Sequence, residues 1–339
     1  MTVISYKEKV KKFAENLLAC ENDFAQMQYA VDLIYQVFSE ITGVNTDQLS
    51  TDKDILLPSG KAISTAAAAH CLLEMKRTAV FLRGIHKAIS KKLTENKEGQ
   101  IRILYAGTGP YGTLVIPLLL LNQAGQIKVD LLDINPKSLD ALHKVTGTLE
   151  LDDYIGKVYC ADAATIKLTH LYDIVISEAM QACLKKEPQV AIMQNLIPQC
   201  KADTIFIPEQ ITIDAYLKKR GVWNGDRLLN EGGETTHVGE LFSVKKGNLD
   251  TKNYRRVIDL PTSLNGPHDL LLYTTIIVFD NEVLGINDSS LNRPLKYFEF
   301  RNHYPSSIEF WYNQTDTPKI EYTENGPYYV IGSGCFCEV

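Results

Sequence analysis

Hydrophobic positions in the first part of the chain recur every three or four residues, which is typical of amphipathic helices. This spacing begins in the segment 6–17 and continues to Gly43, a residue type that commonly ends helices. Residues 56–60 break the pattern, and an alanine-rich stretch then predicts one helix over 65–93. We therefore expect residues 1–95 to form an N-terminal helical domain.

The middle of the chain, residues 96–208, alternates short apolar runs with helical stretches. The apolar runs, typical of buried strands, lie at 101–104, 127–133, 158–163 and 172–178, and the helical stretches include 113–121 and 189–196. Alternation of this kind predicts a parallel, doubly wound sheet. The expected fold class is therefore α/β, with a Rossmann-like domain in the middle of the chain.

After Pro208 the sequence becomes rich in β-branched and aromatic residues, separated by turn signals such as Asn325-Gly-Pro. We expect residues 209–339 to form an antiparallel β domain, either a sandwich or a barrel. Strands are predicted near 210–217, 270–279, 295–301, 307–312 and 328–331.

A glycine-rich segment follows the first apolar run of the middle part. Residues 107–112 form a G-x-G-x-x-G pattern, and glycine lets the backbone turn tightly and approach a ligand closely. Asp133 ends the next run, at a place where an acid accepts hydrogen bonds from ribose hydroxyls. That arrangement suits NAD and S-adenosylmethionine (SAM) equally. The loop has no helix N-terminus clearly dedicated to a pyrophosphate, and Pro110 removes one of its N–H groups.

The next two apolar runs also end in acids, at the edge where an open sheet binds its ligands. Asp162 ends one of them, and its carboxylate either accepts from an adenine amino group or caps the following turn. Glu178 ends the other. The residues alone leave both roles of Asp162 open.

These features resemble a class I SAM-dependent methyltransferase over roughly residues 60–215. Within that class the chain resembles the protein arginine methyltransferases, whose double-E loop carries two glutamates nine positions apart. Glu178 and Glu187 have this spacing, and Met180 and Leu184 occupy the positions of the family's methionine and leucine.

Two further segments resemble the same family. Residues 74–78, Glu-Met-Lys-Arg-Thr, are similar to its acid-x-x-Arg-Thr pattern, and residues 205–212 resemble its phenylalanine–proline crossing into the β domain. The chain departs from the family at Tyr105, where an acid is usual, and shows no clear Thr-His-Trp loop in its last third. Three residues of the double-E loop also differ, namely Ala179, Gln181 and Ala182.

The resemblance implies SAM as the cofactor and gives roles to residues of this chain. Arg77 would pair with the SAM carboxylate, whereas a surface ion pair with Glu74 is the plain alternative. Glu178 and Glu187 would be the catalytic pair, although an acid before the helix 189–196 also suits a helix start. The other implied cofactor contacts are Gly107, Thr108, Gly109, Asp133, Ile134, Asp162, Ala163 and Glu178, and the implied acceptor contacts are Glu178, Met180 and Glu187.

Paired carboxylates suit a guanidinium acceptor, because two acids hold it bidentately and draw positive charge toward one nitrogen. The opposite nitrogen then becomes more nucleophilic. We expect SAM-dependent N-methylation of a cationic guanidino or amino compound, preferably a small molecule such as free arginine or an arginine-derived metabolite. The alternatives are a protein arginine methyltransferase, a SAM-binding scaffold without turnover and, more remotely, a NAD-dependent dehydrogenase.

Charge and composition restrict the partners. The 339 residues have a net charge of −6, which argues against a duplex nucleic-acid partner. No apolar run is long enough to predict a transmembrane helix, and the charged start does not resemble a signal peptide. Seven scattered cysteines suit reduced thiols. We expect a cytoplasmic enzyme with a small-molecule partner, no nucleic acid and no membrane, and we leave open whether it is a homodimer.

No metal site is predicted. Cys335 and Cys337 lack a matching second pair, and the histidines lack the spacing of metal ligands. His237 is expected to be structural, since it lies close to acids, and His303 is only a weak candidate for the acceptor side.

Overall fold

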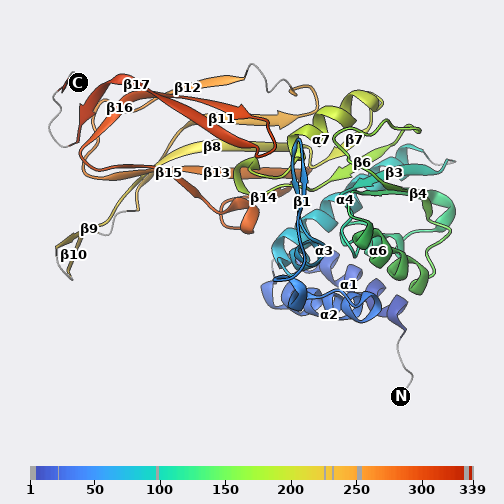
Figure 1. Cartoon of the computed structure of the whole chain (residues 1–339). Coiled ribbons are helices and arrows are strands. Elements are labelled where there is room, and N and C mark those ends of the chain that lie inside the picture. Colours follow the sequence, from blue (N-terminus) through green and yellow to red (C-terminus); the bar gives the residue numbers. More distant parts are fainter. Residues whose placement is uncertain are drawn as a thin grey trace.

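The computed structural model describes residues 5–21, 23–96, 99–224, 227–230, 233–249, 254–331 and 336–337 (Figure 1). The first two helices of the N-terminal part lie below the central sheet in this view, and the C-terminal strands extend away from the sheet to the left. We predicted no metal site at Cys335 and Cys337. The side chains of these two residues lie outside the described part of the structure.

The N-terminal part is helical, as predicted. Helices α1 (Tyr6–Ala19) and α2 (Phe24–Thr42) pack together and against α4 (Met75–Glu95). Ser5 and Asp23 cap α1 and α2 by accepting backbone N–H groups, which satisfies donors that a helix start leaves unpaired. Gly43 ends α2 in the left-handed conformation with φ 75°, as the sequence predicted.

The single helix predicted over 65–93 is wrong, because the structure divides it into α3 (Thr65–Cys71) and α4. At the break, the Thr78 hydroxyl donates to the Leu72 carbonyl at 2.9 Å. This side-chain bond gives the Leu72 carbonyl a partner where the helical backbone pattern is interrupted. The break places Glu74 and the first turn of α4 beside the carboxyl ends of the strands of the central sheet.

The central sheet is parallel, and its order is β5-β4-β3-β6-β7. Its strands are β3 (Ile101–Ala106), β4 (Ile127–Asp133), β5 (Ile155–Cys160), β6 (Ile174–Ser177) and β7 (Ile205–Ile207). The chain runs outward from β3 in one direction to β5 and then in the other to β7, so β3 lies at the point where the strand order reverses. Open sheets bind ligands outside the carboxyl ends of their strands at such a point.

The helix predicted over 113–121 is much shorter, since α5 spans only Ile116–Leu119. Gly112 has φ 59°, a left-handed conformation that does not continue a helix. Pro117 in the first turn adds no N–H donor. The predicted helix 189–196 is confirmed as α7 (Gln189–Leu196), and α6 (Pro136–Thr148) follows β4.

The C-terminal part consists of antiparallel sheets. One sheet contains β8 (Gln210–Lys219), β11 (Thr235–Lys245), β13 (His268–Phe279), β14 (Glu282–Leu284) and β15 (Leu295–Phe300). Another contains β12 (Arg255–Asp259), β16 (His303–Asn313), β17 (Lys319–Val330) and β18 (Phe336–Cys337). Two short ribbons pair β1 (Ile55–Leu57) with β2 (Gly60–Ala62) and β9 (Val222–Asn224) with β10 (Arg227–Asn230). Short 3-10 turns are η1 (Thr46–Gln48), η2 (Ala124–Gln126), η3 (Ala182–Leu184), η4 (Ile197–Gln199) and η5 (Ser290–Asn292).

The prediction for the β part missed several strands, among them β9, β10, β12 and β14, and two longer segments also differ from it. The sequence did not predict β11, because register shifts beside Gly239 interrupt the alternation of buried and exposed positions. The turn predicted at Asn325-Gly-Pro is instead inside β17. There β17 has one more residue than β16 between two neighbouring pairs, which is a bulge that absorbs the glycine and proline.

The predicted fold class is confirmed: a Rossmann-like core with an N-terminal helical segment and C-terminal antiparallel strands. The domain boundaries near residues 95 and 208 stay a prediction. None of the helices within the described ranges combines the length and apolar character that a bilayer crossing requires.

Candidate active site

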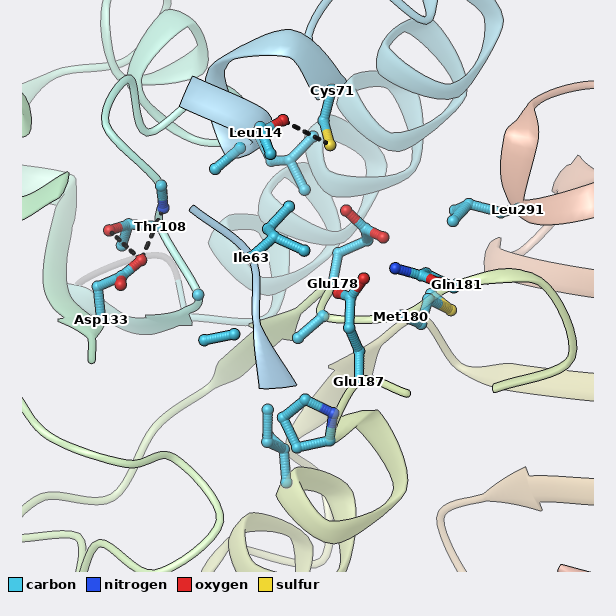
Figure 2. Close-up of a pocket in the computed structure, with 18 of the residues that line it drawn as sticks. Ile63, Cys71, Thr108, Leu114, Asp133, Glu178, Met180, Gln181, Glu187 and Leu291 are labelled. Carbon is cyan, nitrogen blue, oxygen red and sulfur yellow. Dashed lines mark hydrogen bonds between the residues drawn. The ribbon is translucent and has the colours of Figure 1, made fainter. Parts of the chain in front are cut away.

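A cavity of about 530 Å³ lies at the carboxyl ends of β3, β4, β5 and β6 (Figure 2). The predicted site residues come from separate elements, yet the folded chain brings all of them to its wall. They are Arg77, Gly107, Thr108, Gly109, Asp133, Ile134, Asp162, Ala163, Glu178, Met180 and Glu187. Their proximity is a property of the fold, whereas their individual roles stay predictions.

Asp133 organises the glycine loop. Its Oδ2 accepts from the Gly109 N–H at 2.8 Å and from the Thr108 hydroxyl at 3.4 Å, while its Oδ1 accepts from the Asn135 N–H at 2.8 Å. Gly107 and Gly109 have φ values of 81° and 59°, which favour glycine. Burial raises the pKa of the Asp133 carboxyl, and the donated hydrogen bonds oppose that rise. Asp133 thereby holds the loop so that Gly107, Thr108 and Gly109 line the cavity.

Asp133→Asn is expected to weaken binding of S-adenosylhomocysteine roughly 5- to 150-fold, the equivalent of about 1–3 kcal/mol. The amide cannot accept at both positions from the loop and also accept from ribose hydroxyls, the role that the sequence predicts for Asp133. Isothermal calorimetry measures this affinity, and Asp140→Asn, an exposed acid on α6, is the matched control. Equal affinities of the two folded variants would remove Asp133 from the cofactor site.

Asp162 makes the capping contact that the sequence left open, whereas its contact with an adenine amino group stays a prediction. Its Oδ1 accepts from the Ala164 N–H at 2.8 Å, so it caps the turn after β5. It also lines the cavity together with Ala163.

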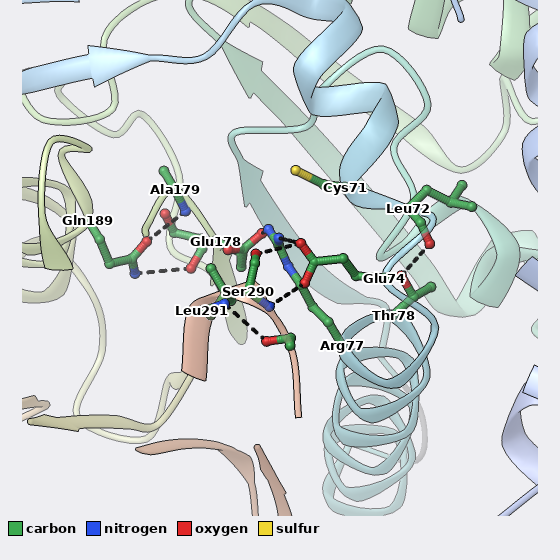
Figure 3. Close-up of polar contacts among 12 residues, drawn as sticks. Cys71, Leu72, Glu74, Arg77, Thr78, Glu178, Ala179, Gln189, Ser290 and Leu291 are labelled. Atoms are coloured by element: carbon green, nitrogen blue, oxygen red, sulfur yellow. Dashed lines mark hydrogen bonds and ion pairs between the residues drawn. The ribbon is translucent and has the colours of Figure 1, made fainter. Parts of the chain in front are cut away.

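Arg77 lies in the first turn of α4 at the centre of a buried ion-pair cluster (Figure 3). Its Nη2 donates to Glu178 Oε2, and its Nη1 is 3.6 Å from Glu74 Oε1. The Arg77 residue is only 7% exposed, so the ion pair with Glu74, which the sequence offered as a surface alternative, is present but largely buried. Burial disfavours the cation, but Glu178 nevertheless holds the pKa of Arg77 above its usual value.

Ser290 joins this cluster from the β part. Its N–H donates to Glu74 Oε2 at 2.9 Å, and its hydroxyl donates to Glu74 Oε1 at 2.5 Å. Glu74 thereby connects η5 to Arg77 (Figure 3). Sequence reasoning missed Ser290, because nothing nearby in the sequence links it to a segment more than two hundred residues earlier.

Glu178 and Glu187 both line the cavity and point toward its middle (Figure 2). Glu178 Oε1 is buried and has no hydrogen-bond partner among the described residues, which is costly for a polar atom. Burial raises the pKa of Glu178, although Arg77 opposes the rise. Glu187 is only 6% exposed, and burial followed by repulsion from Glu178 raises its pKa to about 7. The pair therefore favours a cationic ligand.

The loop between the two glutamates is held from several sides. The buried Gln189 side chain accepts from the Ala179 N–H at 2.8 Å and donates to the Ser177 carbonyl at 3.0 Å. From β16, the Tyr312 hydroxyl donates to the Leu184 carbonyl at 2.9 Å. These bonds fix the start and the middle of the loop, so neither glutamate depends on a freely moving segment.

The β1–β2 hairpin covers the cavity beside this loop. The Lys61 N–H donates to the Lys186 carbonyl at 2.8 Å, and Leu57, Ala62 and Ile63 line the cavity. Gly60 permits this approach, because a Cβ at that position would lie 2.7 Å from the Lys186 oxygen. Together with α3, the hairpin covers one side of the cavity.

Glu187→Gln is expected to stabilise the ligand-free protein at pH 8 by roughly 2–3 kcal/mol. Between the ordinary value of 4.5 and about 7, the unfolded chain releases this proton while the folded protein retains it. The free energy of unfolding therefore falls as pH rises through that window, and glutamine removes the effect. Urea unfolding at pH 5 and pH 8 measures it. A wild-type curve that is no steeper with pH than that of Glu187→Gln would contradict the burial argument.

Tyr105, His237 and His303 are the remaining positions that the sequence analysis singled out. Tyr105 lines the cavity, and burial raises its pKa well above the usual value, so it contributes a neutral hydroxyl. His237 lies outside the cavity lining, with its Nε2 2.9 Å from Asp214 Oδ1. His303 is likewise outside it, on β16 near the Tyr328 ring. No cluster of His, Cys, Asp and Glu within the described ranges could hold a metal ion.

Among the comparisons with known proteins, the search of solved structures found similar chains. No protein-family model matches the chain, and no curated protein matches it. A chain of the Trypanosoma brucei PRMT1 enzyme-prozyme heterotetrameric complex with AdoHcy is similar at 14% identity, with a TM-score of 0.40. The alignment covers 74% of this chain and 96% of that one.

Proposed function

We propose that this protein is a SAM-dependent N-methyltransferase for a small cationic guanidino or amino compound. One observation carries the proposal: two buried carboxylates, Glu178 and Glu187, share a cavity with a glycine loop at the strand-order reversal of a Rossmann-like sheet. The pair needs a cation to offset its repulsion, and the rest of the cavity offers the groups that an adenosyl cofactor requires.

The residues around the cavity are of the chemical types that would bind the separate parts of SAM. The volume of about 530 Å³ falls within the range of small-molecule sites, roughly 300–1,000 Å³. Asp133 and Asp162 offer acceptors for hydroxyl and amino donors, while Gly107 and Gly109 leave room beside the backbone. Arg77 is the cation available for a carboxylate on that side. When bound, SAM supplies an electrophilic methyl group on a sulfonium.

The two glutamates would bind and activate the acceptor. Both carboxylates can hold one guanidinium by charge-assisted hydrogen bonds and draw its positive charge toward the nitrogens they contact. The remaining nitrogen then gains electron density for attack. The buried wall around Glu187 excludes water, which strengthens these contacts.

A small acceptor fits the covered site better than a peptide. The β1–β2 hairpin and α3 line one side of the cavity, and the turn 290–293 lines another. An extended peptide needs an open groove on both sides of its arginine, and these segments restrict that space. Protein arginine remains the alternative acceptor, and cofactor binding without turnover remains the second alternative.

One experiment separates these proposals. The protein is incubated with SAM and, in parallel, with free guanidines, amines and arginine-rich peptides, and mass spectrometry detects products one methylene heavier. We expect product with small guanidines. Product with peptides alone would support the protein acceptor, and cofactor binding without any product would support the scaffold.

A further inference from the structure

We infer that the acceptor carries a carboxylate as well as a guanidinium, and that Lys185 and Arg293 bind this carboxylate. The inference rests on the proposed function and names the substrate class more closely. It assigns a second, anion-binding subsite within the same cavity, opposite in charge to the glutamate pair.

The two cations lie in neighbouring segments. Lys185 directly follows η3 and Arg293 directly follows η5, and these two short turns contact each other. Both residues line the cavity that holds Glu178 and Glu187. Lys185 is half-buried and Arg293 is exposed, which places this subsite toward the mouth of the cavity.

In the described part of the chain, neither cation has a counter-charge. Within the residues that the structure describes, no hydrogen bond or ion pair engages the Lys185 ammonium or the Arg293 guanidinium. Nearby cations are paired: Lys61 with Asp54 and Lys76 with Asp288. Two unpaired cations on one cavity wall attract an anion, and Arg is well suited to a planar carboxylate.

A zwitterionic guanidino acid matches a cavity that has two carboxylates at one place and two cations at another. Its guanidinium meets the two glutamates, and its carboxylate meets the two cations at the mouth. A decarboxylated or amidated compound offers no anion, and a residue inside a peptide replaces the carboxylate by a neutral amide. The subsite therefore favours free guanidino acids over decarboxylated or amidated guanidines and over arginine residues inside peptides.

The carboxylate of SAM is the competing ligand for these cations. Arg77, on α4 beside Glu178, is the cation on the cofactor side, whereas Lys185 belongs to the loop that carries the glutamates. Cofactor affinity therefore distinguishes the two ligands.

The test compares L-arginine, L-argininamide and agmatine as acceptors for the wild type, Lys185→Gln, Arg293→Gln and the double variant. Lys186→Gln, an exposed neighbour outside the cavity lining, is the matched control. We expect wild-type kcat/KM to be roughly 10- to 100-fold higher for L-arginine than for the other two. The double variant should lose that preference mainly through KM, while affinity for S-adenosylhomocysteine stays unchanged.

Three results would overturn the inference. Equal wild-type turnover of L-arginine and L-argininamide would remove the carboxylate from recognition while leaving the proposed function intact. Loss of S-adenosylhomocysteine binding in the double variant, but not in Lys186→Gln, would assign the cations to the cofactor. Absence of product with every guanidine and every amine would reject the proposed function itself, and the inference with it.

Discussion

Glu187→Gln is expected to lower methyl transfer by about 10²- to 10³-fold, the usual cost of removing one preorganised electrostatic contact. Glutamine keeps the size of the side chain but loses the charge that holds and polarises the acceptor. Affinity for S-adenosylhomocysteine should change little, because Glu187 follows the loop and is not paired with Arg77. Single-turnover rates at saturating SAM measure the effect.

Two comparisons make this prediction specific. Glu15→Gln changes an exposed acid on α1 and should leave the rate unchanged. The variant Glu178→Gln should also be slow, and the double variant should lose less than the sum of both free-energy costs, since the pair acts on one group. A Glu187→Gln enzyme with wild-type turnover would show that Glu187 only marks the start of α7.

Arg77→Leu is expected to destabilise the protein by about 3–5 kcal/mol, as breaking a buried ion pair typically does. Leucine leaves the buried Glu178 carboxylate without its main partner. The penalty should shrink at pH 5, because burial already raises the pKa of Glu178 and a protonated acid carries no charge to compensate. Urea unfolding at pH 8 and pH 5 tests both statements.

A second substitution should rescue the first. Adding Glu178→Gln to Arg77→Leu removes the orphaned charge, so the double variant should be more stable than Arg77→Leu alone. Arg301→Leu, which removes an exposed ion pair with Glu299, should cost little. If Arg77→Leu is no less stable than Arg301→Leu, the buried cluster does not hold the site together.

The sequence was informative where short-range patterns determine the backbone. Alternating apolar runs predicted the parallel sheet, and the glycines and Asp133 pointed to the edge of the sheet where the cavity lies, because strand ends and tight turns are local properties. The family resemblance carried by the nine-residue spacing from Glu178 to Glu187 implied a pair, and both residues line the cavity.

Long-range contacts could not be predicted in the same way. Ser290 reaches Glu74 only because η5 folds back onto α4, and no local signal marks that return. The break after Cys71 has a hydroxyl bond from Thr78 to the Leu72 carbonyl, which the apolar pattern does not indicate. Strand β11 was obscured by its register shifts, where bulges interrupt the pattern that strand prediction uses.

The position of the transferred methyl group tests the central claim most directly. The protein is incubated with methyl-labelled SAM and L-arginine, and the product is fragmented in a mass spectrometer to locate the label. We predict a labelled methyl on a guanidino nitrogen with the wild type, and almost none with Glu187→Gln in the same assay. A label on another atom, or equal guanidino labelling by both proteins, would contradict the role of the glutamate pair.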